Sequence, residues 1–88
     1  MRAYTINRTI KDKDLLLKNL LAGKAILIDV RTNHEFVGFH LPNAINISPE
    51  NLSVQLDKIR SWKKPIVVYS SYGLRSKLAA HILLKEGI

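Results

Sequence analysis

The apolar residues of this chain fall into short unbroken runs that alternate with segments of helical periodicity. The runs Ala25–Val30 (AILIDV) and Ile66–Tyr69 (IVVY) are rich in β-branched residues and do not alternate with polar positions. Such runs are typical of strands that are covered on both faces, so we expect both to lie centrally in a parallel sheet. Shorter runs at Ala3–Ile6 and Ala44–Ile47 predict further strands.

Two segments in the first half of the chain have the pattern of helices. Thr9–Leu21 begins at a residue that can cap a helix, and it is followed by Gly23, which tolerates the positive φ of a helix end. Thr32–Glu35 has the spacing of a capping box and predicts a short helix, in a segment that Pro42 closes.

Two further helices are predicted in the second half. Ser48 as cap, Pro49 in the first turn and Glu50 near the positive dipole end indicate a helix start. The last helix spans Leu74–Lys85 and is capped by Gly87. The core faces expected for these two helices are Leu52, Leu56 and Ile59 for the first, and Leu74, Leu78, Ile82, Leu83 and Ala79 for the second.

Strands and helices therefore alternate along the chain, which is the pattern of right-handed crossovers in a parallel sheet. A chain of 88 residues is enough for one domain and not for two. We expect a single α/β domain over residues 1–88, with a mainly parallel sheet of four to five strands and helices on both faces, making three layers.

The composition limits the kinds of site and partner that the chain can have. The chain has no cysteine, which excludes disulfides and thiolate metal sites, and its three histidines are scattered, so we expect neither a metal nor a cofactor. The net charge of +7 favours anionic partners. A basic group around Trp62 is one alternative site, for nucleic acid. The simpler interpretation is a solvated helix end with Trp62 partly buried, so we do not expect nucleic acid as the partner.

No apolar run approaches the roughly 20 residues that a membrane-spanning helix needs. The first residues, MRAYTINRTIKDKD, also lack the apolar centre of a signal peptide. We therefore expect a soluble cytoplasmic protein that does not bind a membrane.

Candidate binding residues follow the two predicted central strands. In open parallel sheets, ligands bind beyond the carboxyl ends of the strands. Asp29–Arg31 follows the first central strand, and the segment SSYGLRS follows the second and leads directly into a helix. Backbone N–H groups at such a helix start, with Gly73 for a tight turn and Arg75 for charge, are suited to binding an anion. The residues of this loop are Ser70, Ser71, Tyr72, Gly73, Leu74, Arg75 and Ser76.

Two sequence blocks resemble the signatures of the rhodanese family. AILIDVRTNHEFVGFHLPNAINIS is similar to the first signature, a buried strand ending in Asp-Val-Arg, then Glu-Phe, then His-hydrophobic-Pro. KPIVVYSSYGLRSKLAAHILLKEG is similar to the second, in which a strand ends in Tyr-Cys, followed by two residues, Gly, any residue, Arg and Ser. The two blocks cover essentially the whole chain, in the family's order.

The resemblance implies roles for individual residues. In the family, the loop cysteine takes the outer sulfur of a donor such as thiosulfate and holds it as a persulfide. Ser70 occupies that cysteine position, because Gly73, Arg75 and Ser76 match at offsets three, five and six. Phosphatases of the same fold place their Arg one residue further from the nucleophile, so the spacing argues against phosphatase activity. The resemblance also implies that Asp29, Arg31 and Glu35 support the wall of the site.

The chain departs from the family at several positions. Ser70 is the main one: oxygen cannot carry a persulfide, so we expect no turnover of thiosulfate. Phe39 replaces a Gly, and it either narrows the mouth of the site or packs on the core. Asn43 replaces another Gly and tolerates positive φ. We interpret His40 as a packed structural residue.

The family continues past the last helix into a further strand, which the resemblance places inside the sheet beside Ile66–Tyr69. We expect this chain to lack that strand and therefore to expose an apolar sheet edge. The expectation is that the chain is part of a longer protein, or that a protein partner or a second copy covers the edge.

Three functions remain open at this point. The first is a non-catalytic rhodanese-like module that binds a small sulfur-containing or other anion, or a protein, through the loop. The second is a sulfurtransferase whose cysteine was replaced deliberately. The third is a basic nucleic-acid-binding domain.

Overall fold

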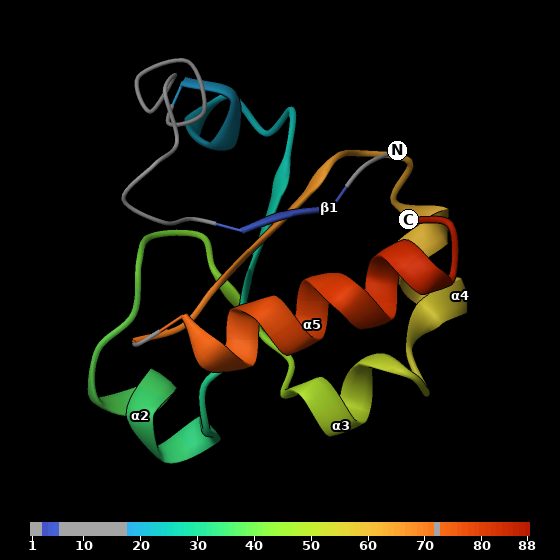
Figure 1. Ribbon diagram of the computed structural model, residues 1–88. Helices are drawn as coiled ribbons and strands as arrows, with labels where there is room; N and C mark the ends of the chain where they lie inside the picture. Colours follow the sequence, from blue (N-terminus) through green and yellow to red (C-terminus); the bar gives the residue numbers. More distant parts are fainter. Residues whose placement is uncertain (1–2, 6–17, 72) are drawn as a thin grey trace.

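A parallel sheet organises the chain. The structure is a computed structural model that describes residues 3–5, 18–71 and 73–88. Its strands run in the order β1-β4-β2-β3, and every neighbouring pair is parallel (Figure 1). The strands are β1 (Ala3–Thr5), β2 (Ile26–Asp29), β3 (Ile45–Asn46) and β4 (Ile66–Tyr69).

The two strands predicted to be central are central. β2 lies between β4 and β3, with Ile28 opposite Val68 on one side and Ile45 on the other. Leu27 and Ile28 are buried on opposite faces of the sheet, in two separate apolar clusters. Burial on both faces explains why the sequence of β2 shows no alternation.

The expected exposed edge beside β4 is wrong. β1 pairs with β4 along its length, from Ala3 opposite Ile66 to Thr5 opposite Val68. The backbone groups on that side of β4 are therefore hydrogen-bonded within the chain, and β4 is an internal strand. The expectation that this chain is part of a longer protein stays a prediction.

The helices of the described residues are mostly where the patterns predict them. They are α2 (Asn33–Gly38), α3 (Pro49–Leu52), α4 (Leu56–Ser61) and α5 (Leu74–Lys85). The helix expected from Ser48 is interrupted: Gln55 has φ −115° and ψ 15°, outside the helical region, and separates α3 from α4. None of the helices in the described ranges is long and apolar enough to cross a membrane.

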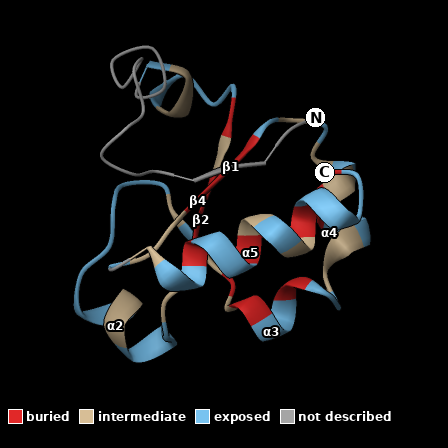
Figure 2. Ribbon diagram, viewed as in Figure 1, coloured by how far each residue is buried: buried red, intermediate tan, exposed pale blue. Residues whose placement is uncertain are grey.

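Helices α3, α4 and α5 cover one face of the sheet (Figures 1 and 2). Leu52, Ile59 and Leu83 contribute to the core on this face. Leu20 packs against the smaller cluster on the opposite face. Residues 18–21 are helical and end before Gly23, whose φ is +72°. Residues 9–17 of the predicted first helix lie outside the described residues.

The buried face of α5 agrees in part with the predicted one. Ala79 and Leu83 are buried and Ile82 packs against the main core, as predicted. Leu74 is 78% and Leu78 53% exposed, so these two positions are wrong, and Ser76 is buried instead. Ser76 can be buried because its hydroxyl donates to the Gly73 carbonyl oxygen, and apolar periodicity does not reveal such a position. The C-terminal end of α5 follows the prediction for Gly87, with φ +80° and a hydrogen bond from the Ile88 N–H to the Leu83 carbonyl.

Candidate functional site

The carboxyl ends of β2 and β4 lie side by side. Asp29, the last residue of β2, pairs in register with Tyr69, the last residue of β4. The two predicted segments, the turn after β2 and the loop of residues 70–76, therefore leave the same edge of the sheet next to each other. This position is where ligands bind in open parallel sheets.

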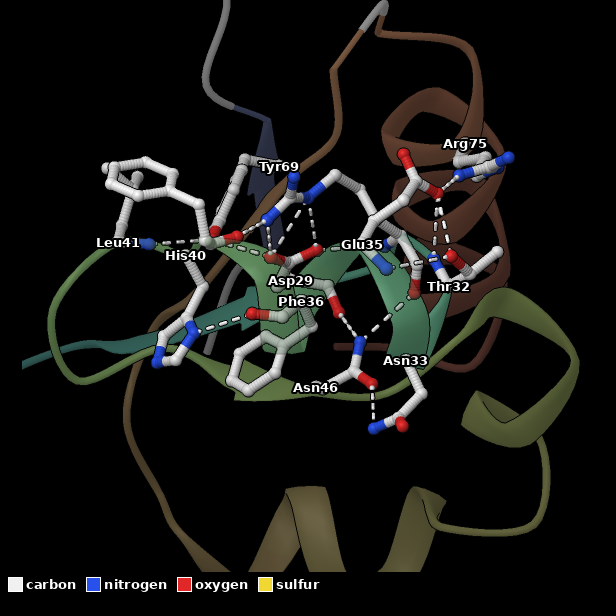
Figure 3. Close-up of polar contacts among 12 residues, drawn as sticks. Asp29, Thr32, Asn33, Glu35, Phe36, His40, Leu41, Asn46, Tyr69 and Arg75 are labelled. Atoms are coloured by element: carbon white, nitrogen blue, oxygen red, sulfur yellow. Dashed lines mark hydrogen bonds and ion pairs between the residues drawn. The ribbon is translucent and has the colours of Figure 1, made fainter.

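Asp29 is a fully buried carboxylate whose oxygens are well supplied with donors. It accepts hydrogen bonds from the Arg31 backbone N–H at 2.9 Å, from the Arg31 Nη2 at 2.7 Å and from the Tyr69 hydroxyl at 2.7 Å (Figure 3). Burial raises the pKa of Asp29, but the hydrogen bonds from Arg31 and Tyr69 outweigh it, so the pKa lies below its ordinary value. The ion pair with Asp29 likewise raises the pKa of Arg31.

The same network holds the chain segment of residues 39–41. The Arg31 Nη2 donates to the Phe39 carbonyl oxygen at 2.5 Å. The Leu41 N–H donates to the Tyr69 hydroxyl oxygen at 3.1 Å. The side chain of Asn46 adds support by donating to the Asp29 and Arg31 carbonyl oxygens, each at 3.0 Å. The turn after β2 is thus a scaffold that positions a neighbouring loop.

The loop after β4 is hydrogen-bonded to the first turn of α5. The Ser76 backbone N–H donates to Ser70 Oγ at 3.1 Å, and the Ser76 hydroxyl donates to the Gly73 carbonyl oxygen at 3.0 Å. Gly73 has φ +80°, a left-handed conformation that favours glycine. Ser70 Oγ therefore sits where an N–H group at the helix start reaches it. Tyr72, which the sequence also places in this loop, lies outside the described residues.

Arg75 and Glu35 face each other across this loop. Their Nη1 and Oε1 atoms are 2.6 Å apart, and both side chains are partly exposed (Figure 3). Glu35 also completes the predicted capping box of α2, with hydrogen bonds between Glu35 and Thr32 in both directions. The hydrogen bond from Arg75, together with those from Thr32, lowers the pKa of Glu35 to about 2.

Two hollows meet at Ser70 and Ser71. One of about 170 Å³ is also lined by Glu35, Leu74 and Arg75 and is the more polar of the two. The other, of about 190 Å³, is mainly apolar, and its remaining lining residues are Arg31, Phe39, His40, Leu41 and Tyr69. Ser70 therefore lies between a charged subsite and an apolar one.

The individual side-chain predictions have mixed outcomes. Phe39 is 72% exposed and lines a hollow, so the alternative that it packs on the core is wrong. His40 is exposed, with its ring stacked on Phe36 at 3.8 Å between centroids, so it is not buried as a packed residue would be. Asn43 does adopt positive φ, 65°. Trp62 is partly buried against the main core, as the simpler interpretation of the basic group expects.

Sequence reasoning missed the residues that link the site together. The sequence pattern places Asn46 only within a strand, although a polar side chain within AINI is a usable signal for a further role. The role of the Tyr69 hydroxyl had no local signal, because its partners Asp29 and Leu41 lie 40 and 28 positions away.

The arrangement places a guanidinium beside two hydroxyls and offers no thiol for sulfur chemistry. In the part of the chain that the structure describes, no three His, Asp or Glu side chains gather as metal ligands would. The groups that face the hollows are the Ser70 and Ser71 hydroxyls and the Arg75 guanidinium, whose hydrogen bond to Glu35 uses Nη1.

Comparisons with known proteins agree with these features. Residues 12–88 match the family described as Rhodanese-like domain. The chain is 33% identical over 90 residues to a tRNA sulfurtransferase of Thermoplasma acidophilum, and 42% identical over 77 residues to the uncharacterized protein YqhL of Bacillus subtilis. It is also 42% identical over 69 residues to a probable molybdopterin-synthase adenylyltransferase of Gracilaria tenuistipitata.

The aligned regions cover much of this chain and less of its relatives. The three alignments include 100%, 85% and 74% of this chain, but 18%, 60% and 19% of the respective relatives. No solved structure matches the chain.

Proposed function

Because the chain belongs to the rhodanese-like domain family, we propose that it is a non-catalytic module that binds a small sulfur-containing anion through the 70–76 loop. The observation that carries this proposal is the 3.1 Å hydrogen bond from the Ser76 N–H to Ser70 Oγ. It means that the loop points an amide at the atom which, in the family, would be the cysteine sulfur. The environment suited to an anion is retained, while the sulfur nucleophile is absent.

Serine does not replace cysteine in this chemistry. A hydroxyl is far less acidic than a thiol, and an oxygen cannot accept and pass on a sulfane sulfur as a persulfide does. Ser71, the other hydroxyl at the hollow, meets the same objection. The module therefore recognises an anion without turning it over.

Arg75 supplies the positive charge of the site, and Glu35 neutralises part of it. A guanidinium next to open backbone donors binds oxyanions through charge-assisted hydrogen bonds. The Glu35 carboxylate occupies one of the Arg75 nitrogens and adds a negative charge to the same hollow. We infer that Glu35 keeps anion affinity modest.

A second candidate function is sulfur transfer by a protein whose cysteine was replaced. It is favoured by the intact loop and by the similarity to a protein named as a tRNA sulfurtransferase. The gene sequence at codon 70 distinguishes the two candidates: a serine codon in the natural gene supports the binding module.

The binding proposal is tested by titrating sulfate and thiosulfate into the protein by calorimetry at low ionic strength. Removal of a charge-assisted contact in Arg75→Ala is expected to weaken binding about tenfold or more. Lys77→Ala is the matched control, because Lys77 is an exposed cation of the same helix that lines neither hollow at Ser70. Equal losses in the two variants would mean that only overall charge attracts the anion.

Glu35→Gln sharpens the same test. Glutamine can still serve in the capping box, so the helix start is retained while the negative charge is removed. We expect tighter sulfate binding by roughly two- to tenfold, a typical range for a partly exposed charge pair. Unchanged binding would show that the anion does not sit near Arg75.

A further inference from the structure

Apolar side chains border Ser70 and are exposed to solvent to different degrees. Phe39 is 72% exposed, Leu74 78% and Leu41 37%. Single exposed apolar residues are ordinary on a protein surface. These three are different, because each lines one of the two hollows that share Ser70 and Ser71.

The segment that carries Phe39 and Leu41 is held by two partly buried side chains, Arg31 and Tyr69. The Phe39 carbonyl accepts from Arg31, and the Leu41 N–H donates to the hydroxyl of Tyr69. Arg31 and Tyr69 are both hydrogen-bonded to the fully buried Asp29 (Figure 3). An apolar wall is thus held in place by a polar network, which is the arrangement of a preorganised ligand site.

The size of the hollows restricts what they can bind. The apolar hollow measures about 190 Å³ and the charged one about 170 Å³. Sites for drug-sized ligands usually measure about 300–1,000 Å³. Each hollow therefore suits one small group, an apolar one beside Phe39 and an anionic one beside Arg75.

We propose that Phe39 and Leu41 make the site selective for a small organic anion, whose charged head, sulfonate-like in shape, binds at Ser70 and Arg75 and whose apolar group packs on Phe39. This inference rests on the proposed anion-binding function of the 70–76 loop and names the class of ligand.

The charges at the site favour the same class. The Glu35 carboxylate lines the charged hollow and neutralises part of the Arg75 charge. Because the Arg75 and Glu35 charges largely cancel, a second negative charge on the ligand gains little attraction at this hollow. A monoanion with an apolar group gains contact area at Phe39 and Leu41 instead.

The test compares benzenesulfonate with methanesulfonate, two monoanions with the same head. Binding is measured by chemical-shift titration of the full chain. We expect benzenesulfonate to bind about tenfold more tightly, which corresponds to burial of part of one ring. Phe39→Ala should bring the two affinities to within about twofold of each other and leave methanesulfonate binding nearly unchanged.

Val37→Ala is the matched control. Val37 is 73% exposed, close in sequence to Phe39, and lines neither hollow, so its truncation should leave the preference for benzenesulfonate intact. Arg75→Ala should weaken the binding of both sulfonates.

The outcomes separate this inference from the function on which it rests. Binding of both sulfonates with equal affinity, lost in Arg75→Ala, would overturn the apolar selectivity and retain the anion site. A preference that persists in Phe39→Ala would overturn the role of Phe39. If neither sulfonate nor sulfate binds, the anion-binding function itself is wrong.

Discussion

The two turns at the carboxyl ends of β2 and β4 lie next to each other but are built in opposite ways. The turn after β2 centres on Asp29, which is fully buried and accepts hydrogen bonds from Arg31 and Tyr69. In the loop after β4, Ser71, Leu74 and Arg75 are exposed around two hollows. The first turn has its polar groups satisfied internally, whereas the second presents donors to solvent.

This difference assigns the two turns different roles. A buried polar group that is fully hydrogen-bonded rigidifies the structure around it. Exposed donors beside a guanidinium are available for a ligand. Asp29 should therefore matter chiefly for stability, and the 70–76 loop chiefly for binding.

The largest expected effect comes from Asp29→Ala. Removal of one partner of a buried ion pair leaves Arg31 without its carboxylate, so we expect the free energy of unfolding to fall by about 3 kcal/mol or more. Urea denaturation measures this loss. Ser71→Ala, an exposed position of the other turn, should change it by less than about 0.5 kcal/mol. Similar losses of unfolding free energy in both variants would show that the two turns do not differ in their contribution to stability.

Tyr69→Phe should have an intermediate effect. It removes the hydroxyl that donates to Asp29 and accepts from the Leu41 N–H. We expect a loss of about 1–2 kcal/mol in urea denaturation, since one of the two hydrogen bonds is to a carboxylate. The preference for benzenesulfonate should also decrease, while methanesulfonate affinity is retained. Full stability in Tyr69→Phe would show that the network does not hold the 39–41 segment.

The pH dependence of the unfolding free energy compares the two carboxylates of the site, and we expect a smaller effect here. The pKa of Asp29 lies below its ordinary 3.8, and that of Glu35 lies at about 2 instead of 4.5. Groups with a depressed folded-state pKa stabilise the fold above the unfolded pKa, and this contribution is lost as pH falls toward the folded pKa. The free energy of unfolding should therefore decrease as pH falls from about 4.5 to about 2.

The two carboxylates should not contribute equally to this acid sensitivity. Glu35 is partly exposed and its ion pair is screened by solvent, whereas Asp29 is buried. Asp29→Asn should flatten the pH profile more than Glu35→Gln does, in denaturation measured at successive pH values. An equal flattening by both variants would contradict the assignment of Asp29 as the structural carboxylate.

Local sequence patterns were sufficient for much of this architecture. The capping box at Thr32, the left-handed glycine after α5 and the two buried strands depend on neighbouring residues or on composition. On α5, apolar periodicity placed Ala79 and Leu83 correctly, but Leu74 and Leu78 are exposed and the polar residue Ser76 is buried instead. The pairing of β1 with β4 joins residues far apart in the sequence.

In the candidate site, too, the sequence predicts some of the residues, whereas their long-range contacts depend on the fold. The 70–76 loop and Arg75 were predicted from their position between a central strand and a helix, and Glu35 from the family resemblance. The contact of Arg75 with Glu35 and that of Tyr69 with Asp29 each span 40 positions, so only the fold brings them together. For Phe39 the sequence left two alternatives open, and the fold decides between them: the side chain is 72% exposed and lines a hollow.

The most direct test of the account is a thiosulfate-to-cyanide sulfur transfer assay on the protein and on Ser70→Cys, side by side. In Ser70→Cys, the thiolate would take the outer sulfur of thiosulfate and release sulfite, and cyanide would then remove that sulfur as thiocyanate and regenerate the thiolate. The account predicts thiocyanate production by Ser70→Cys and none by the protein with Ser70. A folded Ser70→Cys protein without turnover, or turnover by the Ser70 protein itself, would contradict it.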